Sequence, residues 1–195
     1  MKVGVLALQG DVQEHVSVLA EVGADPVEVR RSEDLAGVDA LVLPGGESTT
    51  LSLLLDSSGL GQAVAGRLAD GMPVLGTCAG MILLAREIRG GRPDQHSFGV
   101  VDIAVRRNGF GRQAESFECS LEAPSLGPVP LHAVFIRAPA VEEVGPEVEV
   151  LATVPRPDGS ESPVLCRQGR HVVTCFHPEL SGDGRVHAMF IGLAG

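Results

Sequence analysis

The sequence predicts an α/β fold, with a mostly parallel central sheet flanked by helices and continued by an antiparallel or mixed extension. Up to Leu84, short aliphatic runs alternate with segments that carry apolar residues at helical spacing, which is typical of parallel strands joined by crossover helices. Beyond about Gly90, β-branched segments are separated by Gly, Pro or Asp turns instead of helices. No internal repeat, low-complexity tract or linker interrupts the 195 residues, so we expect a single domain over residues 1–195.

The first half of the chain supplies the parallel strands and their helices. Apolar runs predict strands at Lys2–Leu8, Pro26–Val29, Asp39–Leu43 and Met72–Leu75. Helical spacing predicts helices at Val12–Val22, which stops at Gly23, through Leu51–Leu55 with Ser48 or Thr49 as the cap, at Gly59–Asp70, and from Met81 to Ala85.

The second half is predicted to consist of strands closed by one short helix. The strand candidates are Phe98–Val105, Gln113–Leu121, Leu131–Ile136, Val148–Val154, Val164–Gln168 and His171–Cys175. The helix is Gly182–Gly195, with Val186, Met189, Phe190 and Leu193 on one face.

Composition excludes several classes of function. The net charge of -10 and the 3% aromatic content, with no Trp or Tyr, argue against a nucleic-acid partner. No apolar run is long enough to span a membrane, so we expect no membrane partner and a cytoplasmic location. The four cysteines are then expected to be reduced, and because their spacing matches no zinc pattern we predict no metal. Cys119, Cys166 and Cys175 are predicted to be small buried side chains.

The segment Gly76–Gly80 is the strongest chemical signal in the chain. A cysteine flanked on each side by a glycine two residues away, between a strand and a helix, predicts a nucleophile elbow that raises Cys78 above the sheet edge. The glycines are needed because the turn is strained and the neighbouring backbones pass too close for a Cβ. The alternative is an ordinary buried cysteine beside a tight turn.

A cysteine nucleophile needs a base and a group that orients it. His177 follows the strand His171–Cys175, and Pro178 favours extended backbone, so His177 and Glu179 are predicted to project together from one strand end. A surface turn with incidental charges would be the alternative if this segment stood alone.

The third element is the loop that follows the strand Asp39–Leu43. In elbow enzymes an oxyanion hole combines the N–H after the nucleophile with an N–H from a neighbouring loop, and Ala79 and Gly46 fit these two places. A plain glycine turn is the more common explanation of such a pair, and there is no nucleotide-binding signature here.

Taken together, these segments resemble the class I (triad) glutamine amidotransferase domain. More narrowly, the chain resembles the glutaminase subunits of pyridoxal 5′-phosphate synthases, in order from Lys2 to about Phe190. The segments that carry the narrower resemblance are Leu8-Gln9-Gly10, Gly45-Gly46-Glu47-Ser48-Thr49-Thr50, Arg107-Asn108-Gly109-Phe110-Gly111-Arg112-Gln113 and Phe135-Ile136-Arg137-Ala138-Pro139.

The resemblance implies a flavodoxin-like three-layer sandwich that hydrolyses L-glutamine to L-glutamate and ammonia through a Cys-His-Glu triad and a glutamyl thioester. It implies no cofactor. It places the glutamine site on Gly46, Glu47, Ser48, Arg107, Ile136 and Arg137, where a guanidinium suits the α-carboxylate. It also implies a partner in a large hetero-oligomer, a (β/α)8-barrel synthase subunit, which takes up the ammonia.

Two other interpretations stay open. One is the glutaminase subunit of another amidotransferase, such as that of histidine biosynthesis, which should lack the segments at 107–113 and 135–139. The other is a catalytically silent subunit that binds glutamine without hydrolysing it. Without the resemblance, Arg106 and Arg107 would suggest a solvated basic turn.

Overall fold

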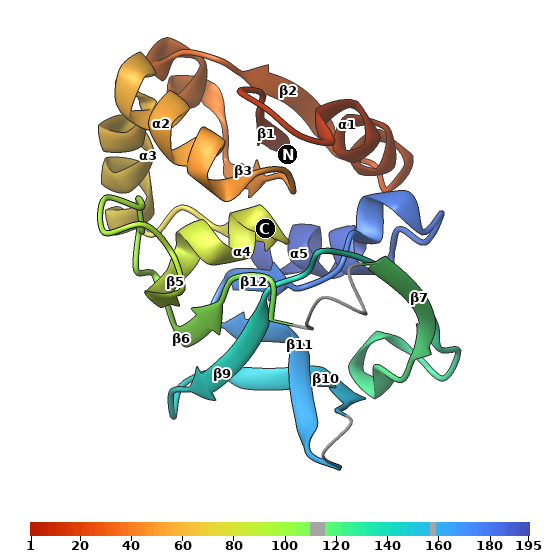
Figure 1. Cartoon of the computed structure of the whole chain (residues 1–195). Coiled ribbons are helices and arrows are strands. Elements are labelled where there is room, and N and C mark those ends of the chain that lie inside the picture. Colours follow the sequence, from red (N-terminus) through yellow and green to blue (C-terminus); the bar gives the residue numbers. More distant parts are fainter. Residues whose placement is uncertain (110–115, 157–158) are drawn as a thin grey trace.

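A computed structural model describes residues 1–109, 116–156 and 159–195 of the chain. Its centre is a seven-stranded sheet in the order β10-β11-β12-β4-β3-β1-β2 (Figure 1). The strands are β1 (Lys2–Leu6), β2 (Asp25–Val29), β3 (Ala40–Leu43), β4 (Val74–Thr77), β10 (Glu149–Pro155), β11 (Glu161–Gln168) and β12 (His171–Thr174). The five strands from β12 to β2 are parallel, whereas β11 and β10 continue the sheet in antiparallel pairing. The mostly parallel sheet with an antiparallel extension is confirmed.

Helices cover both faces of this sheet. They are α1 (Val12–Glu21), α2 (Ser48–Ser58), α3 (Leu60–Ala69), α4 (Ala79–Leu84) and α5 (Arg185–Ala194), with the 3-10 helices η1 (Ser32–Gly37), η2 (Pro124–Leu126) and η3 (Pro178–Leu180). The step from β1 to β2 and the step from β3 to β4 run in opposite directions across the sheet. Because such crossovers are right-handed, α1 lies on one face and α2 and α3 on the other. Helix α5 packs against α1, and α4 against α2.

The aliphatic runs form strands because their side chains are buried on both faces. Every side chain of β3 is fully buried, and the remaining core is dominated by Val and Leu from β1, β4 and the helices. Continuous apolar runs of this kind are the pattern of covered parallel strands. In α5, Val186 and Phe190 are buried while Met189 and Leu193 pack at the edge of the core, as expected.

Part of the second half departs from the prediction. The strands β5 (Ala85–Arg89), β6 (Val101–Arg106) and β9 (Ala140–Val144) form one separate sheet, and β7 (Ser116–Leu121) pairs with β8 (Leu131–Ile136) in another. The expectation that all these strands extend the main sheet is therefore wrong. The physical reason is visible in β8, where buried and more exposed positions alternate, because a strand with one dry face cannot lie between two helical layers. Residues 113–115 of one predicted strand lie outside the described residues.

Two smaller expectations also change. The strand at Ala85 replaces the predicted continuation of the helix, which ends at Leu84. The cap of α2 is Glu47, not Ser48 or Thr49, because its carboxylate accepts the backbone N–H groups of Thr49 and Thr50 at 3.1 and 2.7 Å.

The cysteines and the helix lengths complete the comparison. Cys166 and Cys175 are buried as predicted, Cys119 is only partly buried, and all four cysteines are free. Among the described residues, no helix is long and apolar enough to cross a membrane.

Candidate active site

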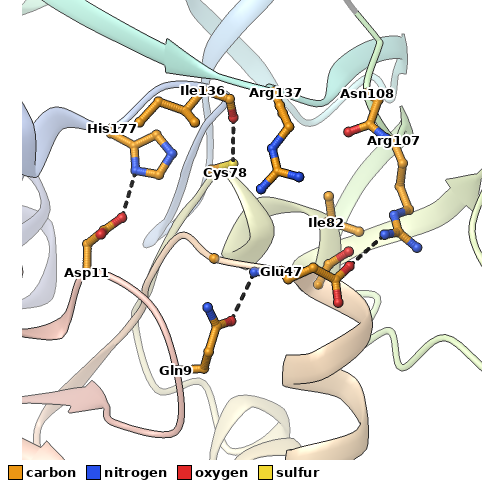
Figure 2. A pocket seen from close by; sticks show the side chains of 12 residues that line it. Gln9, Asp11, Glu47, Cys78, Ile82, Arg107, Asn108, Ile136, Arg137 and His177 are labelled. Carbon is orange, nitrogen blue, oxygen red and sulfur yellow. Dashed lines mark hydrogen bonds and ion pairs between the residues drawn. The ribbon is translucent and has the colours of Figure 1, made fainter. Parts of the chain in front are cut away.

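The predicted functional residues meet at the carboxyl edge of the parallel strands. Strands β1 and β3 are neighbours whose connections leave in opposite directions, which opens a crevice at that edge. A cavity of about 290 Å³ lies there (Figure 2). Its lining comprises Gln9, Asp11, Gly46, Glu47, Ser48, Cys78, Ile82, Arg107, Asn108, Ile136, Arg137 and His177.

Cys78 occupies a strained turn between β4 and α4. Its backbone has φ 49° and ψ -102°, outside the regions that a side chain normally permits, and its N–H donates to the carbonyl of Thr174 at 2.8 Å. A Cβ at Gly80 would overlap the carbonyl oxygen of Leu43, and one at Gly76 would lie 2.8 Å from the Gly80 carbonyl. The turn therefore has the geometry of the predicted nucleophile elbow.

The thiol of Cys78 opens into the cavity from a nearly buried position. Cys78 is 6% exposed, and its sulfur donates to the carbonyl oxygen of Ile136 at 3.8 Å (Figure 2). Ile136 contributes its backbone here, which is consistent with a carbonyl that orients the nucleophile before substrate binds.

His177 is held from both its backbone and its ring. The backbone N–H donates to the carbonyl of Val134 at 2.8 Å, and Nδ1 donates to Oε1 of Glu179 at 2.7 Å. The two side chains are together as predicted, but the predicted extended backbone is wrong, because residues 178–180 form η3. One turn of 3-10 helix brings side chains two residues apart into contact as well as a strand end would.

The charge state of His177 is set by competing effects. Burial lowers the pKa of its imidazole, but the neighbouring Cys78 sulfur and the Glu179 carboxylate outweigh burial and raise the pKa to about 10. Nε2 is buried and completes no hydrogen bond among the described residues. Catalytic contacts are often long before substrate binds, so this nitrogen is free to take up its role then.

Glu179 lies behind the ring, away from the cavity. Its side chain is fully buried, and burial raises the pKa of the carboxyl against the opposing hydrogen bond and charge of His177. The carboxylate is positioned to fix the tautomer of the imidazole and to stabilise its charged form.

A second carboxylate, that of Asp11, also contacts the imidazole of His177, and the sequence analysis did not predict it. Its Oδ2 lies 3.2 Å from Nδ1 of His177, compared with 2.7 Å for Glu179 (Figure 2). Among the described residues, the three side chains also form one group whose atoms lie within 4.8 Å of one another, close enough to hold a metal ion. We interpret these three side chains as a histidine held by two carboxylates rather than as a metal site, because Nδ1 of His177 already donates its proton to Glu179.

The loop after β3 brings Gly46 beside the nucleophile. Gly46 has φ 142° and lines the cavity, and the next peptide N–H, that of Glu47, donates to Oε1 of Gln9 at 2.9 Å (Figure 2). Ala79, the first residue of α4, is buried directly after Cys78. The assignment of the oxyanion hole to Gly46 and Ala79 stays a prediction.

Glu47 and Arg107 form an ion pair on one wall of the cavity, 2.8 Å apart (Figure 2). Partial burial raises the pKa of Glu47, but the N–H groups of Thr50 and Thr49 outweigh it and lower the pKa to about 2. Arg107 also donates to Thr49 at 2.9 Å and to Gln95 at 3.3 Å. Its guanidinium is thus largely engaged by the protein itself.

Arg137 differs from Arg107 in its surroundings. No ion pair to it occurs within the described parts of the chain, and Figure 2 shows its guanidinium inside the cavity. Arg137 has φ 43°, and the other non-glycine residues described with positive φ are Cys78 and Asn108. All three line the cavity. Such strain is typical of functional sites, and it favours Arg137 as the cation left for a ligand.

Four residues of the lining were absent from the sequence-based site: Gln9, Asp11, Ile82 and Asn108. Gln9 and Asp11 follow the first strand, so the rule that strand ends share one edge would have found them. Ile82 lies one helical turn beyond Cys78 on α4, and helical spacing alone could have placed it there.

Fold and site together define a protein of the class I glutamine amidotransferase type. A solved structure entitled "Crystal structure of glutamine amidotransferase" superposes with a TM-score of 0.89 at 49% identity, covering 99% of this chain and 98% of that one. A chain of the structure entitled "Structure of PurLQS from Thermotoga maritima" shares the fold, with a TM-score of 0.66 at 16% identity over 98% of this chain and 96% of its own.

The family follows from the sequence comparisons. The model of the SNO glutamine amidotransferase family matches residues 5–194. Two curated proteins named pyridoxal 5′-phosphate synthase subunit PdxT are similar throughout. The one from Frankia casuarinae is 56% identical over 97% of this chain and 93% of its own length, and the one from Rhodococcus jostii is 54% identical over 98% and 96%. This chain belongs to the SNO glutamine amidotransferase family.

Proposed function

We propose that this chain is the glutaminase subunit of a pyridoxal 5′-phosphate synthase and hydrolyses L-glutamine to L-glutamate and ammonia. The observation that carries the proposal is the strained Cys78 in one cavity with His177, whose Nδ1 donates to the buried Glu179 at 2.7 Å. The similarity to curated proteins named pyridoxal 5′-phosphate synthase subunit PdxT supports the assignment to pyridoxal 5′-phosphate synthesis.

The first chemical step is attack of the Cys78 thiolate on the side-chain carbonyl carbon of glutamine. A carbon–sulfur bond forms while the carbonyl electrons move to oxygen, and the N–H groups assigned to Gly46 and Ala79 hold that oxyanion. His177 accepts the thiol proton and, with a pKa raised to about 10, keeps it until the leaving group needs it.

Collapse of this intermediate breaks the carbon–nitrogen bond. His177 gives its proton to the departing nitrogen, so ammonia leaves and a glutamyl thioester remains on Cys78. The neutral imidazole then takes a proton from water, whose oxygen forms a bond to the thioester carbon; the carbon–sulfur bond breaks, which releases glutamate and returns the Cys78 thiolate. Glu179 holds the ring and stabilises its charged form throughout.

The ends of glutamine need their own partners. Arg137 is proposed to bind the α-carboxylate, because a guanidinium fork matches a carboxylate and this one lies in the cavity. Arg107 supports the same site through Glu47, with which it is paired at 2.8 Å. Backbone groups of Gly46, Glu47, Ser48 and Ile136 complete the proposed glutamine site.

The product determines the partner. Ammonia released into neutral water is largely protonated and no longer a nucleophile, so a free glutaminase would waste it. We propose that the chain works as a single domain in the cytoplasm, docked in a large hetero-oligomer to a (β/α)8-barrel synthase subunit that consumes the ammonia. No cofactor of its own enters the proposed chemistry.

Glutamate release tests the proposal directly. The purified chain is assayed alone and with a pyridoxal 5′-phosphate synthase barrel subunit, with Cys78→Ala as the control. We expect hydrolysis that rises strongly on mixing and disappears in the variant. Activity indifferent to the barrel subunit would assign the chain to another amidotransferase, such as that of histidine biosynthesis. Absence of activity, with no labelling of Cys78 by a glutamine-analogue alkylator, would indicate a silent glutamine-binding subunit.

A further inference from the structure

Two buried histidines lie on the far side of Glu179 from the His177 ring, and the proposed chemistry uses neither. His15 comes from α1 and His187 from α5, and both are fully buried. Nε2 of His15 lies 3.4 Å from Oε2 of Glu179 and 3.2 Å from Oγ1 of Thr77, the residue that precedes the nucleophile. Nδ1 of His15 lies 2.9 Å from Nε2 of His187.

The contacts determine which nitrogens carry protons. If Nδ1 of His15 held the proton, its bare Nε2 would face a carboxylate oxygen, and His187 would leave a buried N–H at Nδ1, which has no partner among the described residues. A buried donor without a partner is costly. If His187 instead donates from Nε2 to Nδ1 of His15, then Nε2–H of His15 points to Glu179 and Thr77. The second arrangement leaves no buried N–H without a partner, and it turns this N–H toward Oε2 of Glu179, a buried oxygen that completes no other hydrogen bond among the described residues.

Both rings are neutral in this arrangement. Burial lowers the pKa of His15 well below its usual value, and the charges of His187 and His177 lower it further. Burial also lowers the pKa of His187 to about 4. The ionisable groups around Glu179 are therefore His177 and Asp11 on the cavity side and a neutral His15 on the other, and no buried cation among the described residues competes with His177 for the carboxylate.

We propose that His15, with its tautomer set by His187, is a positioning residue that holds the carboxylate of Glu179 by donating from Nε2 to Oε2. Oε1 of the same carboxylate is thereby left to orient His177. The line of contacts runs from α5 through α1 to the triad and joins residues that are 172 positions apart in the sequence. The inference rests on the proposed glutaminase function, because it assigns a role within that triad.

A matched pair of substitutions separates positioning from packing. In His15→Gln the terminal amide nitrogen lies four bonds from Cα, as Nε2 does in histidine, so a donor toward Glu179 is kept. In His15→Asn the side-chain amide reaches only three bonds from Cα, to the place of Nδ1, where its oxygen can accept from Nε2–H of His187, so only the contact toward His187 is kept. His132→Gln, at an exposed histidine on β8, serves as the control.

The kinetic readout is the split between kcat and KM for glutamine, measured in the complex with the barrel subunit. A hydrogen bond to a charged group contributes about tenfold or more. We expect His15→Asn to lower kcat by about tenfold or more at unchanged KM, and His15→Gln to retain kcat within about threefold. Equal kcat losses in the two variants, or wild-type kcat in both, would overturn the proposal.

A spectroscopic readout on the unmutated chain does not depend on activity or on how the variants fold. In protein labelled with ¹⁵N-histidine, the ring nitrogen shifts at about pH 7.5 report the tautomer directly. We expect the proton of His15 on Nε2 and that of His187 on Nε2. A proton on Nδ1 of His15 refutes the proposal even if the chain is an active glutaminase, whereas an inactive chain with the expected tautomers would refute the proposed function and leave this arrangement standing.

Discussion

Replacement of His187 by leucine should make the protein less sensitive to acid. The imidazole is fully buried in the folded chain, and burial lowers its pKa from 6.5 to about 4. Below pH 6.5 the unfolded chain therefore binds a proton that the folded chain refuses. The free energy of unfolding is therefore at its full value above pH 6.5, and the contribution of this ring is lost progressively as the pH falls from 6.5 toward 4.

The size of this effect follows from the shift. One pKa unit corresponds to about 1.4 kcal/mol, so the whole shift changes the free energy of unfolding by about 3 kcal/mol. About 2 kcal/mol of this change occurs between pH 7.5 and pH 5. Urea denaturation measures it, since unfolding of a domain this size has a slope of about 2 kcal/mol per molar. The midpoint of the wild-type chain should then fall by about 1 M more than that of His187→Leu between these two pH values.

Comparing the two proteins removes the contributions of other groups. The raised pKa of Glu179 acts in the opposite direction and stays in the variant, and His15 keeps the burial that is the largest cause of its lowered pKa, losing only the smaller effect of the His187 charge. His132→Leu, at an exposed histidine, serves as the control for the removal of an imidazole. If His187→Leu and the wild type lose stability in parallel between pH 7.5 and pH 5, the buried neutral ring, and with it the tautomer argument, is wrong.

Four further predictions concern the triad, the cavity and the elbow. Glu179→Gln should lower kcat by about 10³-fold or more, because the neutral amide no longer stabilises the charged ring and its NH2 group can hold Nδ1 in the wrong tautomer. Asp11→Asn, whose contact to the ring is 0.5 Å longer (3.2 against 2.7 Å), should change kcat by less than about threefold, and a larger loss in steady-state glutamate release would reverse the ranking of the two carboxylates. Arg137→Ala should raise KM for glutamine by about tenfold or more at little cost in melting temperature, and by more than Arg107→Ala does; an unchanged KM would remove Arg137 from the substrate site. Gly80→Ala should destabilise the fold by about 2 kcal/mol or more, since its Cβ would overlap the backbone of β3, and a melting temperature within about 2 °C of wild type would show that the turn can relax.

The local pattern of the chain was enough for most of the parallel half. Aliphatic runs bounded by turn residues located β1, β3 and β4, since strands covered on both faces have no polar alternation to obscure them. The strands β7 and β8 were also located, but their assignment to the main sheet was wrong, and the boundary between α4 and β5 was missed. The sheet that such a strand joins depends on its pairing partner, and the local sequence pattern does not specify that partner.

The site shows the same division. Cys78, His177 and the loop at Gly46 follow predicted strands, so their meeting at one edge could be expected from topology alone. The second carboxylate at Asp11 could have been expected on the same ground. The contact of the Asp11 carboxylate with Nδ1 of His177 could not have been predicted, because this contact depends on the direction in which one side chain points.

By itself, the sequence determined the order of strands and helices up to α4, the glycines that permit the turn at Cys78, and the chemistry of the groups at the strand ends. Only the tertiary structure decided that Arg107 is engaged by Glu47 while Arg137 faces the cavity, and that His15 and His187 meet behind Glu179. The physical reason is that spacing along a chain encodes which face of an element is apolar. Contacts between distant elements depend on strand order and helix packing, and these are established when the whole core closes.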